Sequence, residues 1–163
     1  YSRKKEEKDG KRRGRTMIRA MMIEDYEGVY KLWKQIKGFG IRSIDDSREG
    51  LERFLRRNPT TSIVAEEEGE IVGSILCGHD GRRGCFYHVC VAEEHRMKGI
   101  GTQMAKMAMD ALRAEKINQV CLIAFTDNQV GNQFWEQSGW KRREDLNYYD
   151  LSLNEENETT FNR

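Results

Sequence analysis

The chain has 163 residues, of which 34% are charged and 37% hydrophobic, with a formal net charge of +1. This length suits one domain with a substantial core, and no apolar run is long enough for a membrane span or a secretory signal. The cysteines lie in apolar runs without metal-binding spacing, so we expect free thiols and no metal site in a soluble, cytoplasmic protein. They are Cys77, Cys85, Cys90 and Cys121.

The basic charge gathers in the first sixteen residues, which hold eight Lys or Arg and three acidic side chains, a net of +5. Residues 1–16 have almost no apolar content and cannot bury enough surface to fold alone. We interpret them as a flexible basic leader, added for expression or cut from a longer frame, ahead of a domain over 17–153. A nucleic-acid-binding arm is a weaker alternative, because Tyr1 is the only aromatic residue there.

A strand over 17–23 and two helices are predicted at the start of the domain. Acidic Glu24 and Asp25 favour a helix start, and apolar residues then recur at helical spacing until the glycines of 37–40. A second helix follows and stops before Pro59, since the residue before a proline disfavours helical backbone. Its predicted N-cap is one of three polar residues: Asp45, Asp46 or Ser47.

Three antiparallel strands are predicted next. The runs 61–66 and 70–77 flank Gly69, which supplies the positive φ of a tight hairpin. A turn over 79–84 then leads to the run 85–91, whose β-branched and aromatic residues suit a mostly buried strand. These segments predict a meander whose last strand is central to the domain.

The remaining elements complete a mixed α/β order. They are a helix that follows the 92–99 turn, a strand over 118–125 and a helix that Asp127 or Asn128 caps. A last pair of strands is predicted over 140–153, and the polar tail 154–163 is expected to fray.

A glycine-containing turn joins the 85–91 strand to its helix. Gly99 and Gly101 stand where the helix begins, so several backbone N–H groups are left unpaired there. The helix dipole adds partial positive charge, and nearby basic side chains add full charges. The turn therefore predicts a site for a phosphate or pyrophosphate. It is made of Arg96, Met97, Lys98, Gly99, Ile100, Gly101 and Thr102.

The string Val-x4-Arg-x2-Gly-x-Gly, from Val91 to Gly101, resembles the acetyl-CoA-binding motif of the GCN5-related N-acetyltransferases, the GNAT family. The resemblance covers roughly 17–153 and implies the GNAT fold, a splayed, mostly antiparallel sheet flanked by helices. It also implies that the turn amides bind the pyrophosphate of acetyl-CoA and that the helical pair before Pro59 lines the acceptor side. The strand backbone at Val89, Cys90 and Val91 would then contact the pantetheine arm.

A second landmark runs from Asn128 to Trp140 and is similar to the family's Asn…Phe-Tyr-Glu-Lys-x-Gly-Phe segment. The resemblance implies a contact between Asn128 and the cofactor, which is compatible with a helix cap. Trp135 replaces the Tyr that usually serves as general acid, and an indole N–H is too weak an acid for that step. Water, Tyr148 or Tyr149 would have to replace it.

His88, on the 85–91 strand, is the first choice for a general base, because a neutral imidazole suits proton removal near pH 7. A plain sheet histidine is the competing interpretation. Asp80 and Glu93 are weaker candidates, and His79 and His95 are interpreted as solvated turn residues. Ile123 occupies the position of the Glu that serves as base in relatives acting on ribosomal proteins, which disfavours that subtype.

The sequence therefore predicts an acetyl-CoA-dependent N-acetyltransferase that acts by direct transfer in a ternary complex. The acceptor would be a primary amine of a small molecule or a protein, and a homodimer is compatible with the family. A family fold that binds coenzyme A with weak or lost catalysis is the alternative, and no membrane or nucleic-acid partner is expected.

Overall fold

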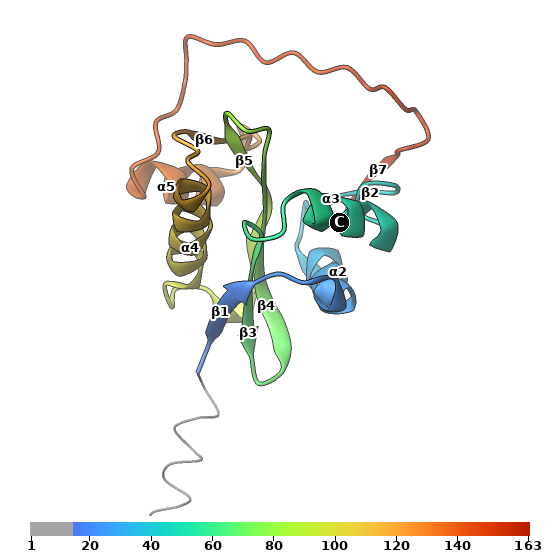
Figure 1. Cartoon of the computed structure of the whole chain (residues 1–163), viewed down its shortest axis with the longest axis vertical. Helices are drawn as coiled ribbons and strands as arrows, with labels where there is room; N and C mark the ends of the chain where they lie inside the picture. Colours follow the sequence, from blue (N-terminus) through green and yellow to red (C-terminus); the bar gives the residue numbers. More distant parts are fainter. Residues whose placement is uncertain (1–14) are drawn as a thin grey trace, which may run out of the picture.

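The computed structural model describes residues 15–163, so the predicted leader lies outside the described residues except for Arg15 and Thr16. A five-stranded sheet in the order β1-β3-β4-β5-β6 forms the centre (Figure 1). All its pairs are antiparallel except β5–β6, which is parallel. The strands are β1 (Met17–Ala20), β3 (Ile63–Glu67), β4 (Glu70–His79), β5 (Gly84–Val91) and β6 (Val120–Leu122).

Helices cover both faces of this sheet. In Figure 1, α4 (Ile100–Ala114) and α5 (Gln129–Gln137) lie on one side and α2 (Tyr26–Gln35) and α3 (Arg48–Arg57) on the other. Short 3-10 turns, η1 (Ile23–Asp25) and η2 (Glu93–His95), precede α2 and α4. Seven successive residues of β4 are buried, which is the pattern of a strand packed on both faces. The predicted mixed, mostly antiparallel sheet with flanking helices is therefore confirmed.

The ends of α3 follow the predicted chemistry. Ser47 is the N-cap, and its side chain accepts a hydrogen bond from Gly50 N at 3.1 Å. Glu49 stands in the first turn and two arginines in the last, as the helix dipole favours. Of the three predicted caps, Asp46 does not cap the helix, because its carboxylate is buried and accepts the backbone N–H of Arg42 instead.

The end of the chain differs from the prediction. Residues 140–158 contain no strand, so the predicted pair of strands over 140–153 is wrong. The tail does not fray either, because β7 (Thr159–Phe161) pairs antiparallel with β2 (Gly40–Arg42). Backbone pairing with a segment of 40–42, far away in sequence, gives the polar tail the partners that its composition does not reveal.

Asn162 anchors that tail to the domain. Its side-chain amide donates to the carbonyl of Trp33 at 2.7 Å and to the carbonyl of Ile36 at 2.8 Å. Both carbonyls lie at the end of α2, where each also accepts one backbone N–H, from Ile36 and from Phe39. The tail thus caps a helix as well as extending a two-stranded sheet.

We predict that Asn162→Ala lowers the free energy of unfolding by about 1–3 kcal/mol, because two hydrogen bonds to helix-end carbonyls are lost. Urea denaturation of the two proteins measures the difference. Arg163→Ala is the matched control, since it alters the neighbouring exposed side chain. Equal stabilities for Asn162→Ala and wild type would mean that the two Asn162 hydrogen bonds do not stabilise the fold.

Candidate active site

A β-bulge in β5 shapes the centre of the site. Ser74 of β4 faces Cys90, whereas Leu76 faces Tyr87, so β5 has one residue more than β4 over this interval. His88 lies in the bulge with φ +48°. The extra residue breaks the alternation of side chains, so consecutive residues can point to one side of the sheet.

Tyr87 and His88 both face the layer of α2 and α3. The Tyr87 ring meets the Phe54 ring of α3 edge-on, with centroids 6.2 Å apart. The imidazole of His88 lies between Trp33 and Phe39, at centroid distances of 4.7 and 4.6 Å. The bulge therefore directs a phenol and an imidazole toward the same helices.

A buried carboxylate holds the imidazole. His88 Nε2 lies 2.8 Å from Asp46 Oδ1, and Asp46 is only 3% exposed. The other oxygen, Oδ2, accepts the backbone N–H of Arg42 at 2.7 Å. Within residues 15–163, His88 Nδ1 has no hydrogen-bond partner and is not closed off from solvent. The ring thus offers Nδ1 as its free nitrogen.

Ser74 fixes the bulge from the neighbouring strand. Its hydroxyl accepts the indole N–H of Trp33 at 2.9 Å and donates to the carbonyl of His88 at 2.9 Å. Ser74 and Trp33 are fully buried. The Ser74 hydroxyl and the Trp33 indole N–H therefore both have hydrogen-bond partners, as buried polar groups require.

The C-terminal tail supports the loop that carries Asp46. The side-chain oxygen of Asn157 accepts the backbone N–H groups of Ile44 and Asp45, at 3.0 and 3.2 Å. Its amide donates to the Asp45 carboxylate at 2.9 Å. Residues at the two ends of the chain therefore build this side of the site together.

The glycine turn at the start of α4 has the predicted form. Gly99 is the N-cap with φ +77°, and a Cβ placed on it would meet only Gln103 Nε2, at 3.9 Å. Gly101 is constrained differently, because a Cβ there would lie 3.3 Å from the Phe134 ring. The first N–H groups of α4 have no helical acceptors, so they are free to bind an anion.

The basic residues of the turn have partners within the protein. Arg96 Nε donates to the Val91 carbonyl at 3.0 Å, and Lys98 Nζ lies 3.8 Å from a carboxylate oxygen of Glu67. Met97 is fully exposed with φ +65°. Arg96 thus ties the turn to the end of β5, and Lys98 stays half exposed beside it.

The sheet opens between β5 and β6. Pairing covers only Gly84 to Phe86 on β5, so the stretch from Tyr87 to Val91 continues past the end of β6. Within it, Val89 is half-buried and Cys90 is buried, and burial raises the pKa of the Cys90 thiol to about 11. This gap leaves one backbone edge of β5 without a strand neighbour among the described residues.

Asn128 and Trp135 both belong to the α5 region, at the helix cap and within the helix. Asn128 is the N-cap of α5, and its side-chain oxygen accepts Gly131 N at 3.0 Å. Trp135 is half-buried in a cluster with Phe86 and Trp140, at centroid distances of 6.2 and 4.9 Å. Asn128 therefore has the predicted capping geometry, and Trp135 packs against the same strand that carries His88.

The other titratable candidates lie apart from His88. Asp80 stays in its turn, where backbone N–H groups of Arg83 and Arg82 lower its pKa, and Glu93 is an exposed residue of η2. His79 and His95 are not the solvated residues that the sequence predicted. His79 is paired with Glu115, and His95 Nδ1 lies 3.0 Å from Glu67, because the fold brings those carboxylates to the two turns.

The two tyrosines proposed as acids lie on the exposed segment after α5. Tyr148 is 69% exposed and Tyr149 86% exposed. Burial raises the pKa of Tyr87, and smaller contributions come from Cys85, Cys121 and Tyr148. Within residues 15–163, neither Tyr148 nor Tyr149 makes a side-chain hydrogen bond, so the structure does not attach either phenol to the site.

Sequence reasoning did not assign Asp46 to the site. Its residue type and position favoured a helix cap, and only the folded chain shows its carboxylate against His88. The cysteines also differ in exposure: Cys77 and Cys90 are buried, whereas Cys121 is exposed. Among residues 15–163, no three His, Cys, Asp or Glu side chains gather into a group that could bind a metal ion.

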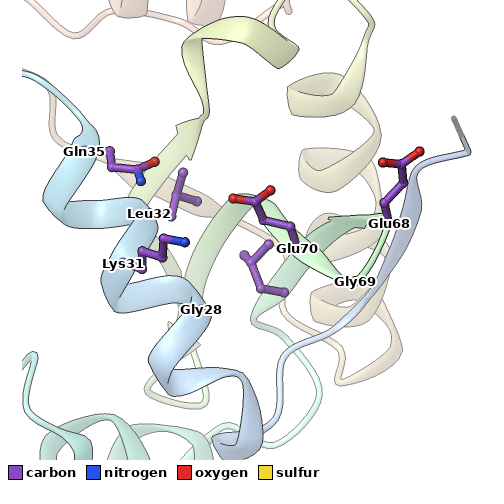
Figure 2. Close-up of a pocket in the computed structure, with 8 residues that line it drawn as sticks. Gly28, Lys31, Leu32, Gln35, Glu68, Gly69 and Glu70 are labelled. Carbon is purple, nitrogen blue, oxygen red and sulfur yellow. The ribbon is translucent and has the colours of Figure 1, made fainter. Parts of the chain in front are cut away.

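A separate pocket of about 380 Å³ lies between α2 and the β3–β4 hairpin (Figure 2). Lys31 and Gln35 reach toward it from α2, and Glu68 and Glu70 flank it from the hairpin. None of the predicted site residues lines it. None of the helices within 15–163 combines the length and apolar character needed to cross a membrane.

Comparisons with known proteins agree with this geometry. Residues 20–140 match the model of the acetyltransferase (GNAT) family. An acetyltransferase of Sodalis glossinidius is 30% identical over 129 residues, which cover 79% of this chain and 89% of the relative.

Solved structures share the fold at low identity. The PaiA N-acetyltransferase of Thermoplasma acidophilum, solved with coenzyme A, is 17% identical with a TM-score of 0.64, over 76% of this chain and 87% of that one. The aminoglycoside N-acetyltransferase AAC(6')-Iy, solved with a bisubstrate analogue, is 14% identical with a TM-score of 0.66, over 85% and 99%.

We predict that Ser74→Ala destabilises the fold by about 1–3 kcal/mol, because the buried indole N–H and a strand carbonyl both lose their partner. Trp33→Phe removes the indole N–H, so Ser74→Ala should destabilise the Trp33→Phe protein less than it destabilises the wild type. Urea denaturation of the four proteins gives this double-mutant cycle. An additive cycle would contradict a functional hydrogen bond between the two side chains.

Proposed function

Because the chain belongs to the GNAT acetyltransferase family, we propose that it transfers an acetyl group from acetyl-CoA directly to a primary amine in a ternary complex. The observation that carries this proposal is that strand β5 connects the glycine turn to the His88–Asp46 pair. One end leads into the glycine turn of α4, and its bulge presents the His88–Asp46 pair. A donor site and an acceptor-side base would then share one strand.

The residues of the turn fit a pyrophosphate. Gly99 leaves open space where a side chain would stand, and the first amides of α4 add the positive end of the helix dipole. The opened edge of β5 at Val89, Cys90 and Val91 would contact the pantetheine arm, with Asn128 and Trp135 on the α5 side. When bound, the coenzyme supplies the acyl thioester, and the protein orients it.

His88 would accept the amine proton at Nδ1, the nitrogen that has no protein partner. Asp46 would keep the imidazole in place and favour the cation that forms when the proton arrives, because it is a buried acceptor 2.8 Å from Nε2. The surrounding rings of Trp33 and Phe39 suit a carbon framework on the acceptor beside its amine. A small-molecule amine and an exposed protein amine both satisfy these contacts.

The leaving thiolate needs an acid or a hydrogen bond that Trp135 cannot supply as a proton. Tyr148 and Tyr149 remain the proposed acids, with water as the third source. A family fold that binds coenzyme A but transfers acetyl groups weakly is the second candidate, and Trp135 is the observation that favours it.

We predict that His88→Gln lowers turnover on the order of 10²–10⁴-fold, as expected for loss of a general base. Asp46→Asn should lower turnover less, because it leaves the imidazole in place. Release of free coenzyme thiol with a panel of amines measures these rates.

His79→Gln is the matched control, because it changes another carboxylate-paired histidine outside the site. Coenzyme affinity should be unchanged in all three variants. A His88→Gln enzyme with normal turnover would rule out the base assignment, and wild-type coenzyme binding without transfer to any amine would favour the binding module.

We predict that Gly99→Val abolishes coenzyme A binding, since a side chain would occupy the space in front of the α4 amides. Gly69→Val is the matched control, because Gly69 has φ +79° and equally open surroundings but lies in the β3–β4 hairpin. Both variants bear similar backbone strain, so titration calorimetry with coenzyme A distinguishes an effect of strain from the loss of the binding site. Equal affinity in the two variants would contradict the placement of the pyrophosphate.

A further inference from the structure

Two cysteines occupy matching positions on the neighbouring strands β5 and β6. Cys85 of β5 pairs in register with Cys121 of β6, and Figure 1 shows the two strands side by side at one edge of the sheet. Neighbouring strands lie about 4.8 Å apart, and a disulfide joins residues whose Cα atoms are about 4.4–6.8 Å apart. Both thiols are free in the structure. The backbone therefore places two reduced cysteines within the range of a disulfide.

The two side chains point to the same face of the sheet. Residues at matching positions on neighbouring strands share a face, whereas successive residues alternate. On the β4 side of Cys85, a Cβ on its partner Gly78 would lie 2.9 Å from the Phe54 ring. Because Phe54 belongs to α3, Cys85 and Cys121 both face the layer of α2 and α3. On this face Cys121 is exposed and Cys85 is half-buried.

The other two cysteines are not placed to bond with either of them. Cys77 pairs with Phe86, the residue next to Cys85 on β5, so its side chain points to the opposite face of the sheet. Cys90 lies beyond the bulge, where β6 no longer pairs with β5. Both Cys77 and Cys90 are buried. The pair in register is therefore the one that combines a shared face with access to solvent.

We propose that Cys85 and Cys121 form a redox-sensitive modification site, which hydrogen peroxide converts to a disulfide and a small thiol restores. The Cys121 sulfur attacks the peroxide, takes one oxygen as a sulfenic acid and releases water. The Cys85 sulfur then bonds to the Cys121 sulfur, and the sulfenic oxygen leaves as a second water with the thiol hydrogen. The two sulfurs together lose two electrons, and the peroxide gains them.

The surroundings of the two thiols support this order of reaction. Burial raises the pKa of the Cys85 thiol to about 11, so this thiol stays protonated at neutral pH. Peroxide reacts with the thiolate rather than the thiol, which makes Cys85 a poor first target. Cys121 is the thiol that solvent reaches. Cys85 is thus the partner that meets a sulfenic acid already formed beside it.

Strand β6 is suited to gain and lose such a bond. It has three residues and pairs only with β5 among the described residues. A disulfide prefers Cβ atoms about 3.8 Å apart, which is closer than the spacing of neighbouring strands, so β6 moves roughly 1 Å toward β5. A short edge strand permits that shift. The remaining strain makes the bond easy to reduce, as in regulatory rather than structural disulfides.

The bond also closes a loop of chain around the glycine turn. The turn and α4 lie between Cys85 and Cys121 in the sequence. Pairing of β5 with β6 ends at Phe86, so the bond joins the strands just before the sheet opens. Oxidation therefore restrains the strand that borders the opening.

Peptide mass spectrometry of the full-length protein after treatment with hydrogen peroxide tests the proposal. The remaining thiols are alkylated in denaturant, and trypsin places Cys121 in one peptide and Cys85 with Cys90 in another. We expect the loss of two of the four thiols and a cross-linked peptide whose fragments assign the bond to Cys85 and Cys121. Glutathione should restore all four thiols.

Cys121→Ser should abolish the cross-link, and Cys77→Ala is the matched control that should keep it, because it removes a thiol from the opposite face. Circular dichroism checks that both variants are folded. In oxidised wild type, hydrogen exchange of amides 120–122 should slow and then recover with glutathione. Four intact thiols after peroxide, over-oxidation of Cys121 without a cross-link, or a bond between two chains would each overturn the proposal.

Discussion

The hydroxyl of Ser74 makes the contacts that the candidate active site depends on. It accepts from Trp33 of α2 and donates to the His88 carbonyl, so one buried atom joins a helix, the central strand β4 and the bulge of β5. Without the bulge, Tyr87 and His88 would face opposite sides of the sheet. The bulge places His88 between Trp33 of α2 and Phe39 and beside Asp46, and the same strand continues to the glycine turn.

Burial decides what the His88–Asp46 pair can do. A carboxylate that is 3% exposed is stable as an ion only where hydrogen bonds replace its hydration, and here Arg42 N and His88 supply them. Because the Asp46 carboxylate is itself held in place, it fixes the orientation of the imidazole. An acceptor amine that met Nδ1 would find a base already aligned, so little rearrangement would precede proton transfer.

Local patterns predicted most of the fold. The periodicity of α2 and α4, the Ser47 cap and the glycine turn follow from neighbouring residues, and all appear as expected. Asp46 was missed because its contact with His88 joins residues that lie 42 positions apart in the sequence. The bulge was missed because it depends on the register between β4 and β5 and has no local sequence signal. The prediction for the end of the chain was wrong for a related reason. The pattern of residues 147–153 is typical of a strand, but a strand needs a neighbouring strand to pair with, and the structure gives this segment none.

The C-terminal segment supports the acceptor side of the site from far away in sequence. Asn157 holds the loop before Asp46 through the backbone N–H groups of Ile44 and Asp45. Asn162 holds the end of α2, the helix whose Trp33 packs against the His88 ring. Local stability falls where few contacts restrain the backbone. The tail therefore restrains both elements that position the imidazole, the loop of Asp46 and the end of α2.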